Sequence, residues 1–400
     1  MRSEINTPLT LLAALLSMLG PFTIDTYLPS FPDIATEFAI SRSLLSQSLG
    51  VYLVTFAVSM LMWGPLADHI GRKPVLIISL LLYIMASIAC AITNNIESFL
   101  LFRSLQGVAA SGSFVASRAM IRDVHDSQTA QQAMSRIMMM FALAPAIAPL
   151  LGGWLQLQFG WRSIFLSLTS FAMLLLLLVL LMRETLPIAS RQPLHPLAIW
   201  HTYKQRAGDR LFMALVSSIA LSFAGLFMYI SGAPVIIYDF LELGVSDFGY
   251  LFIPIVTGMV LGSALASRQA HRWRPRQMIT LGFSLMVLAS LLNLLQALFG
   301  AATVVVIITP MVLYAFGLSL TMPALTILAL DRCPTHRGSA TSMQGFIQMV
   351  LNAAVASIAV PLLQTERLHF VLGQVAFLVA AVVLWWSVAH SKPPQKQVVK

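Results

Sequence analysis

Two charged side chains, Asp25 and Arg103, stand inside long apolar stretches of the sequence. A charge within a membrane-spanning helix costs about 2.5–3.5 kcal/mol on insertion scales and usually marks function. Each lies about four to five residues, or roughly 6–8 Å, from the external end of its predicted helix. At equal depth the two can meet if their helices are neighbours. They predict either a static ion pair or, as we favour, a carboxyl group that exchanges a proton while Arg103 keeps its charge.

The string GPLADHIGRKP, residues 64–74, joins two apolar stretches and concentrates charge in a short turn. Gly64 permits close helix approach, and Gly71 permits a tight turn that residues with a Cβ resist. Asp68 can face the positive end of a helix. Arg72 and Lys73 would anchor the turn at the cytoplasmic membrane surface. By chemistry alone these residues predict an interfacial turn.

A later apolar stretch contains Pro145, Pro149, Gly152 and Gly153. Proline removes a backbone donor and bends a helix, and glycine lets a neighbouring helix pack closely. The pattern predicts either ordinary helix packing or a close contact that limits leak through a transporter, and it supports both equally.

Several aromatic side chains and one amide could line a cavity for lipophilic cations or neutral drugs. Aromatic residues also fill helix cores and membrane belts, so the composition leaves both roles open. The candidates are Tyr27, Tyr52, Gln106, Phe223, Phe227, Tyr229 and Tyr314.

Other chemistries find little support in the sequence. The loop histidines have no metal-ligand spacing, and the two cysteines, Cys90 and Cys333, form no disulfide framework. The string Gly-x-x-x-x-Gly-Lys-Ser/Thr, which binds nucleotide phosphates, does not occur. We therefore expect no metal and no cofactor, and a proton gradient rather than ATP as the energy source.

The composition indicates the class of protein. Of 400 residues, 58% are hydrophobic and only 10% are charged, against about 25% charged in soluble domains. These values exclude a water-soluble enzyme and a disordered chain. The net charge of +9 does not indicate a nucleic-acid partner, because basic residues in membrane proteins usually report topology.

Twelve apolar stretches could position the candidate functional side chains. Each is near the 20 or so residues that a membrane crossing needs. We read the first as a retained helix rather than a secretory signal. The predicted cores are 9–29, 44–65, 75–93, 98–117, 135–157, 162–182, 211–235, 248–267, 277–299, 302–329, 340–363 and 368–389.

Basic residues predict the orientation and the division of the chain. Twenty of the 24 Lys and Arg residues fall in segments that are cytoplasmic if both termini are inside, and three fall outside. The longest polar stretch, 183–210, separates residues 1–182 from 211–400. Residues 72–87 resemble residues 275–290, which indicates either a repeat of six helices or a chance match of apolar sequences. We predict two six-helix bundles joined by a cytoplasmic linker.

Three segments resemble motifs of the major facilitator superfamily. The loop 64–73 has the form G-x-L-A-D-x-x-G-R-K, and 99–110 (FLLFRSLQGVAA) is similar to the fourth-helix motif. Residues 144–153 (APAIAPLLGG) resemble the fifth-helix motif of the antiporters, although Ala144 and Ala148 replace the usual glycines. The resemblance implies a twelve-helix fold in which two bundles rock around a central cavity.

Three further segments resemble the Bcr/CflA drug-resistance subfamily: 24–29 (IDTYLP), 119–123 (AMIRD) and 183–187 (RETLP). Met60 stands where relatives often carry Gln, so the pocket is expected to differ. This resemblance implies drug export coupled to proton entry, with Asp25 and Arg103 at the coupling site.

The resemblance also implies a cytoplasmic gate. In the superfamily, the residue matching Asp68 engages the start of helix 11, and those matching Arg72 and Asp123 complete a charge network. Helix 11 is predicted to start near Ala340 on the same side, so its positive end faces the loop. The contacts would hold the cytoplasmic side closed. The gate candidates are Gly64, Asp68, Gly71, Arg72, Lys73 and Asp123.

The sequence therefore predicts a monomeric, proton-coupled multidrug antiporter of the bacterial inner membrane, whose partners are a small drug-like substrate, protons and the bilayer. One alternative is a facilitator that imports a sugar, an amino acid or an organic acid; against an organic anion, Arg103 is the one basic residue at predicted membrane depth. A membrane-embedded enzyme would need clustered His, Cys or carboxylate groups at one depth, and only Asp25 is available. A channel would show pore-lining symmetry or rings of charge, and the sequence shows neither.

Overall fold

A computed structural model describes residues 7–125, 127–192, 203–269, 272–300, 303–332 and 337–389. Every regular element within these ranges is a helix. Among the residues so described, 11 helical segments are long and apolar enough to cross a membrane. A further long helix, α6 (Ser127–Phe159), corresponds to the predicted span 135–157. The predicted all-helical membrane fold is confirmed.

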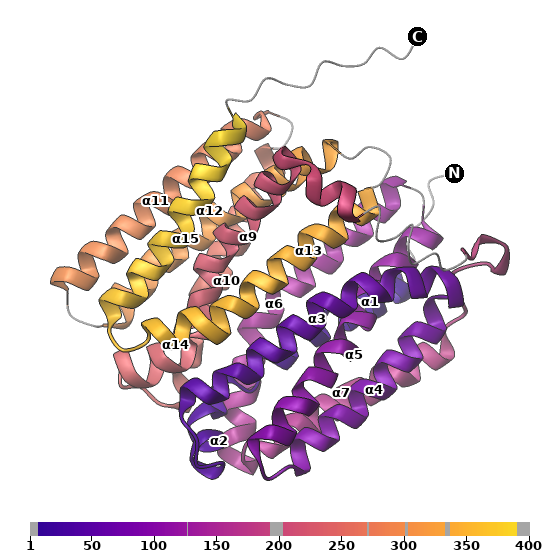
Figure 1. Cartoon of the computed structure of the whole chain (residues 1–400), viewed down its shortest axis with the longest axis horizontal. Coiled ribbons are helices and arrows are strands. Elements are labelled where there is room, and N and C mark those ends of the chain that lie inside the picture. The colour runs from indigo at the N-terminus through magenta and orange to yellow at the C-terminus, as the bar shows by residue number, and fades with distance from the viewer. Residues whose placement is uncertain are drawn as a thin grey trace.

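The first six predicted spans form one packed group (Figure 1). In it α1 packs against α5 and α6, α3 packs against α5, and α4 contacts both α5 and α7. The elements are α1 (Thr7–Asp25), η1 (Leu28–Ser30), α2 (Phe31–Glu37), α3 (Arg42–Ile70), α4 (Arg72–Ile92), α5 (Ile96–Val124), α6 and α7 (Arg162–Leu181).

The last six spans form the second group, in which α12 contacts α9, α10 and α11, and α15 contacts α9 and α11. The connection from the first group contains the short helix η2 (Ile188–Ser190). The elements are α9 (Arg210–Ser231), η3 (Val235–Phe240), η4 (Val245–Asp247), α10 (Phe248–Gln269), α11 (Pro275–Phe299), α12 (Val304–Asp331), α13 (Arg337–Ala354), η5 (Val355–Ala359), α14 (Val360–Leu363) and α15 (Arg367–Ala389).

We call the end of the molecule where α1 begins and α15 ends the terminal end, and the opposite end the distal end. The two groups lie side by side (Figure 1) and meet where α13 contacts α3 and α10 contacts α6. We call the two groups the first half and the second half.

Side-chain caps mark where several helices begin. Ser41 accepts a hydrogen bond from the Leu44 N–H at the start of α3, and Asn95 accepts one from Ser98 N–H at the start of α5. Asp209 accepts two at the start of α9. Each cap satisfies backbone donors that have no partner within the helix.

Two predicted spans are not continuous α-helices. The first was predicted over 9–29, but α1 ends at Asp25 and the chain turns before η1 and α2. Pro29 explains this correction, because a proline has no N–H to bond the carbonyl four residues earlier and its ring clashes with that carbonyl, here that of Asp25, where α1 ends. The span 340–363 is interrupted by η5, a π-helical segment. We call residues 26–30 the α1 break.

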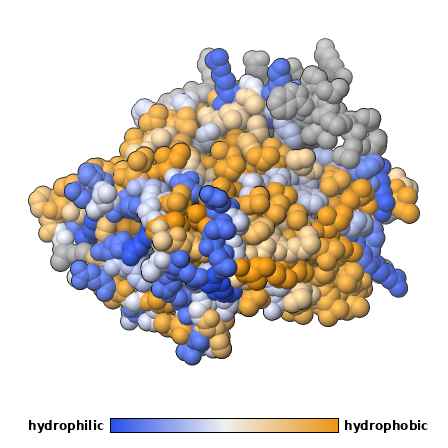
Figure 2. Space-filling view, turned by 60° about the horizontal axis from the view of Figure 1, so that its bottom comes forward, coloured by the Kyte–Doolittle hydropathy of each residue, from blue (hydrophilic) through white to orange (hydrophobic). Residues whose placement is uncertain are grey.

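The surface suits a bilayer. Hydrophobic side chains cover much of the face shown in Figure 2, and hydrophilic ones gather in patches. Large apolar residues are well exposed, for example Leu181 at 76%, Phe299 at 85% and Trp386 at 66%. Exposure on this scale is costly in water and favourable against lipid.

Candidate functional site

Arg103 is fully buried in α5. Its Nη1 donates to Oε1 of Gln106 at 2.8 Å and to the carbonyl oxygen of Thr23 at 3.4 Å. The guanidinium carbon lies 4.5 Å from the centre of the Tyr27 ring and 4.8 Å from that of Tyr52. Cation–π contacts and carbonyl dipoles therefore stabilise the charge. Nε and Nη2 have no hydrogen-bond partner among the described residues.

A network of buried hydrogen bonds surrounds Arg103. Gln106 donates from Nε2 to the Ser87 hydroxyl at 2.7 Å, and the Thr23 and Tyr83 hydroxyls share a bond of 2.5 Å. The Tyr27 hydroxyl bonds that of Ser48 at 2.9 Å. These bonds join α1, α3, α4 and α5 into one polar site inside the first half.

Asp25 is the last residue of α1 and is only 3% exposed. Among the described residues, its carboxyl group makes no hydrogen bond and no ion pair with Arg103, so the static ion pair considered from the sequence does not form here. Arg103 nevertheless bonds the carbonyl oxygen of Thr23, two residues before Asp25 in the same helix. The structure thus places a carboxyl group and a guanidinium in one buried region without pairing them.

The α1 break packs directly against α6. A Cβ atom on Gly152 would overlap the carbonyl oxygen of Thr26, so only glycine fits this contact. Gly153 faces the other way, and a Cβ there would lie 2.9 Å from the carbonyl oxygen of Val245 in the second half. Pro149 is buried and Pro145 half-buried inside α6. The two glycines therefore serve different contacts.

Three gate candidates form a charge network at the terminal end. The Arg72 side chain, 7% exposed, bonds Oδ1 of Asp68 at 2.6 Å and Oδ2 of Asp123 at 2.8 Å. Asp68 is 52% exposed. The first turn of α13, which Asp68 was predicted to engage, includes residues 337–339, whose side chains are outside the described part. Gly64 packs near Val115.

Sequence reasoning missed Glu184, which lies between α7 and η2. Its carboxylate accepts hydrogen bonds from the backbone N–H groups of Arg72 at 3.0 Å and Lys73 at 3.1 Å, at the positive end of α4. Gly71 has φ +110°, and a Cβ there would collide with Glu184. The Lys73 ammonium donates to the carbonyl oxygens of Leu180 and Met182, both at 2.8 Å. The sequence signal that could have identified Glu184 is its place as the acidic residue of the RETLP segment, residues 183–187.

The sequence matches the model of the Major Facilitator Superfamily over residues 10–357. The chain belongs to this superfamily. An uncharacterized MFS-type transporter, YdgK of Bacillus subtilis, is 30% identical over 92% of this chain and 94% of its own. The bicyclomycin resistance protein homolog of Haemophilus influenzae is 27% identical over 86% of each chain. Multidrug resistance protein D of Escherichia coli is 25% identical over the whole of both.

Solved structures agree on the fold of this superfamily. A bacterial homolog of the human lysosomal transporter Spinster, in an inward-facing and occupied conformation, has a TM-score of 0.76 at 14% identity and covers 98% of both chains. A D-xylose–proton symporter has a TM-score of 0.75 at 15% identity, covering 96% of this chain and 98% of its own. The superfamily predicted from the motifs is confirmed, and the names of the relatives agree with the predicted drug-resistance subfamily.

The predicted cavity residues lie in two places within this superfamily fold. Tyr27, Tyr52 and Gln106 surround Arg103 and are fully buried. In the second half the Tyr314 hydroxyl donates to the Ser222 carbonyl at 2.9 Å. Phe223 and Phe227 stack with ring centres 6.1 Å apart. That any of them lines a cavity stays a prediction.

Tyr229 belongs to a second buried polar network, made of neutral groups. Asn293 donates from Nδ2 to the Tyr229 hydroxyl at 2.5 Å and to Oε1 of Gln374 at 2.9 Å. Sequence reasoning overlooked Gln374, a polar amide in an otherwise apolar helix. The charged site and the neutral network thus lie in different halves.

We expect Asp68→Ala to fold normally, because a half-exposed ion pair contributes at most about 1 kcal/mol and Arg72 keeps Asp123. The substitution removes a group predicted to contact the positive end of α13, so the population should shift toward states open at the terminal end. Labelling of cysteines introduced at the terminal end would measure this. Glu366→Ala, at the exposed distal end, is the control. Unchanged labelling would count against a gating role.

Proposed function

We propose that the chain is a proton-coupled antiporter that exports small lipophilic drugs across the bacterial inner membrane by alternating access, and acts as a monomer without converting its substrate. The observation that carries the proposal is Asp25, buried at the end of α1 without a paired cation. Relatives named for multidrug and bicyclomycin resistance support the substrate class.

The proposed coupling follows from the cost of burying charge. A carboxylate buried away from its counter-ion is unfavourable, so Asp25 takes up a proton when enclosed and releases it when the site opens to a less acidic compartment. Arg103 stays charged throughout, because guanidinium does not deprotonate in proteins. Proton and drug then occupy the site in turn.

The proposed direction rests on the distribution of basic residues. Among the described residues, most Lys and Arg lie in the connections and helix ends at the terminal end, which by the positive-inside rule faces the cytoplasm, as both termini then would. The network of Arg72, Asp68 and Asp123 then lies on the cytoplasmic side, where a gate would have to open to admit drug.

Reconstitution into liposomes tests the function. An imposed pH gradient should drive lipophilic cationic or neutral drugs uphill, and a protonophore should abolish the movement. The same liposomes are tested with sugars and amino acids. Uphill transport of these solutes instead of drugs would favour the importer, and drug movement indifferent to the gradient would contradict proton coupling.

A further inference from the structure

A side chain of the second half reaches the α1 break. The Tyr238 hydroxyl donates to the carbonyl oxygen of Pro29 at 2.5 Å. Pro29 lies four residues after Asp25, inside η1. A tyrosine of the second half therefore bonds the short segment that directly follows Asp25, the candidate coupling residue.

Tyr238 comes from an unusual element. It lies in η3, a π-helical turn that follows α9 at the distal end. Its ring packs edge-on against Phe248 with centres 5.6 Å apart, which fixes the direction of the hydroxyl. π-helical turns are rare and occur frequently at functional sites.

The other π-helical element of the second half also contacts the first half. In η5, the carbonyl oxygen of Ser357 accepts a hydrogen bond from Nε2 of Gln47 at 2.8 Å. Beside Tyr238, Asp239 pairs with Arg42 at 2.5 Å, but both side chains are about two-fifths exposed and such pairs contribute little. Tyr238 alone among these contacts touches the α1 break.

The break is also fixed from the side of α6. The Ser30 hydroxyl donates to Oε1 of Gln156 at 2.6 Å, and Nε2 of Gln156 bonds the Asp33 carboxylate. Gly152 packs against Thr26 one turn earlier in the same helix. Because α6 holds the break within the first half, the bond from Tyr238 ties the second half to a segment with little freedom of its own.

We propose that Tyr238 is a positioning residue for Asp25: it ties the second half to the α1 break while the distal end is closed, and releases the break when that end opens. The inference rests on the proposed transport cycle. Through the hydrogen bond to the Pro29 carbonyl, the protonation of Asp25 and the closure of the distal end then depend on each other.

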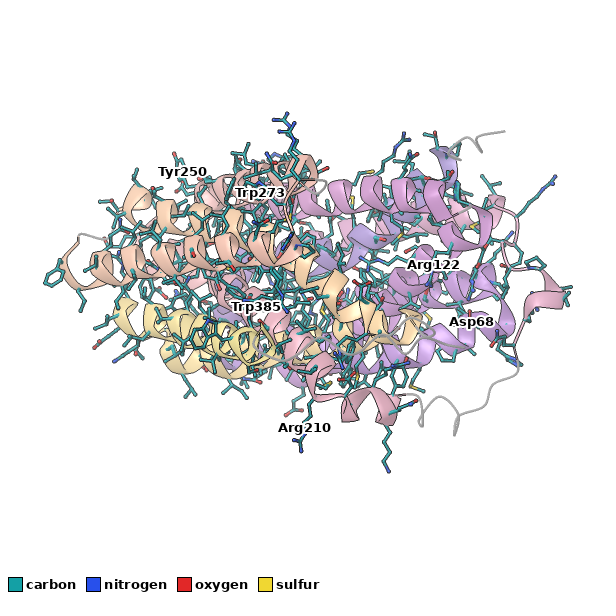
Figure 3. All side chains as sticks on the ribbon, turned by 90° about the horizontal axis from the view of Figure 1, so that it is seen from above. Asp68, Arg122, Arg210, Tyr250, Trp273 and Trp385 are labelled. Atoms are coloured by element: carbon teal, nitrogen blue, oxygen red, sulfur yellow. The ribbon has the colours of Figure 1, made fainter. Side chains whose placement is uncertain are left out.

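The test measures distances between spin labels on Thr36→Cys and Ser246→Cys, two exposed distal positions in opposite halves. The full chain is reconstituted in liposomes with Cys333→Ser, and buried Cys90 is retained. Tyr238→Phe keeps the ring and removes only the hydroxyl. Loss of one hydrogen bond should raise the ratio of distal-open to distal-closed molecules about fivefold. Tyr250→Phe, an exposed tyrosine at the edge of the second half (Figure 3), should change nothing.

A double-mutant cycle with Asp25→Asn tests the coupling itself. The effect of Asp25→Asn on the ratio should differ by more than about twofold between the wild-type background and the Tyr238→Phe background. Additive effects, or a lower melting temperature with an unchanged ratio, would overturn the proposal. If the cycle shows coupling but the liposomes move no drug, the proposed function fails while the link between Tyr238 and Asp25 stands.

Discussion

Asp25→Asn is expected to insert and fold like the wild type but to lose uphill, proton-driven drug transport. Asparagine has nearly the same shape as aspartate and cannot carry the exchanged proton. Its stability should equal or exceed that of the wild type, because a neutral amide avoids the cost of a buried, unpaired carboxylate. Liposomes with an imposed pH gradient measure the transport, and thermal unfolding in detergent measures the stability.

Glu97→Gln is the matched control for Asp25→Asn. Glu97 is an exposed carboxylate in the first turn of α5, the helix that carries Arg103. The same loss of charge there should leave uphill transport unchanged. Full uphill transport by Asp25→Asn would refute the assigned role and leave the energy source of the transporter to be found elsewhere.

Gly152→Ala is expected to impair both stability and transport. Its added methyl group would overlap the backbone carbonyl of Thr26, which cannot rotate away as a flexible side chain can. Overpacking of this kind costs about 1–3 kcal/mol and forces α6 away from the α1 break. We expect a lower melting temperature together with slow transport, since the break directly follows Asp25.

Two glycines provide comparisons for Gly152→Ala. Gly153→Ala meets a carbonyl of the second half at 2.9 Å and should be milder, because the halves can separate slightly. Gly208→Ala has no atom within 4 Å of the added carbon and should lie within about 0.5 kcal/mol of the wild type. Wild-type behaviour of Gly152→Ala would show that α6 does not fix the break.

The helices were predictable because a membrane crossing needs a long apolar run, and each predicted core overlaps a long helix of the structure, although two of the cores are interrupted. The interruption in the first span was not predicted, although Pro29 signals it. Hydropathy averages over a window and does not register that a proline removes a helical hydrogen bond and ends the helix.

The candidate site was predictable where one residue carries the signal. Asp25 and Arg103 stand out because a charge among apolar residues is costly. Their mutual arrangement was not predictable. The rings of Tyr27 and Tyr52, rather than Asp25, lie against the Arg103 guanidinium, and no sequence pattern predicts cation–π partners. The Tyr238 bond depends on how two halves meet, which single-sequence patterns do not encode.

The aromatic enclosure of Arg103 has an electrical consequence. Because rings and dipoles rather than an acid stabilise the guanidinium, the site carries one net positive charge when Asp25 is protonated and none when it is not. Under the proposed cycle the site therefore moves between an electropositive and a neutral form. A membrane potential acts on that difference with about 2.3 kcal/mol per charge for each 100 mV fully crossed, so voltage as well as acidity biases which form faces each side.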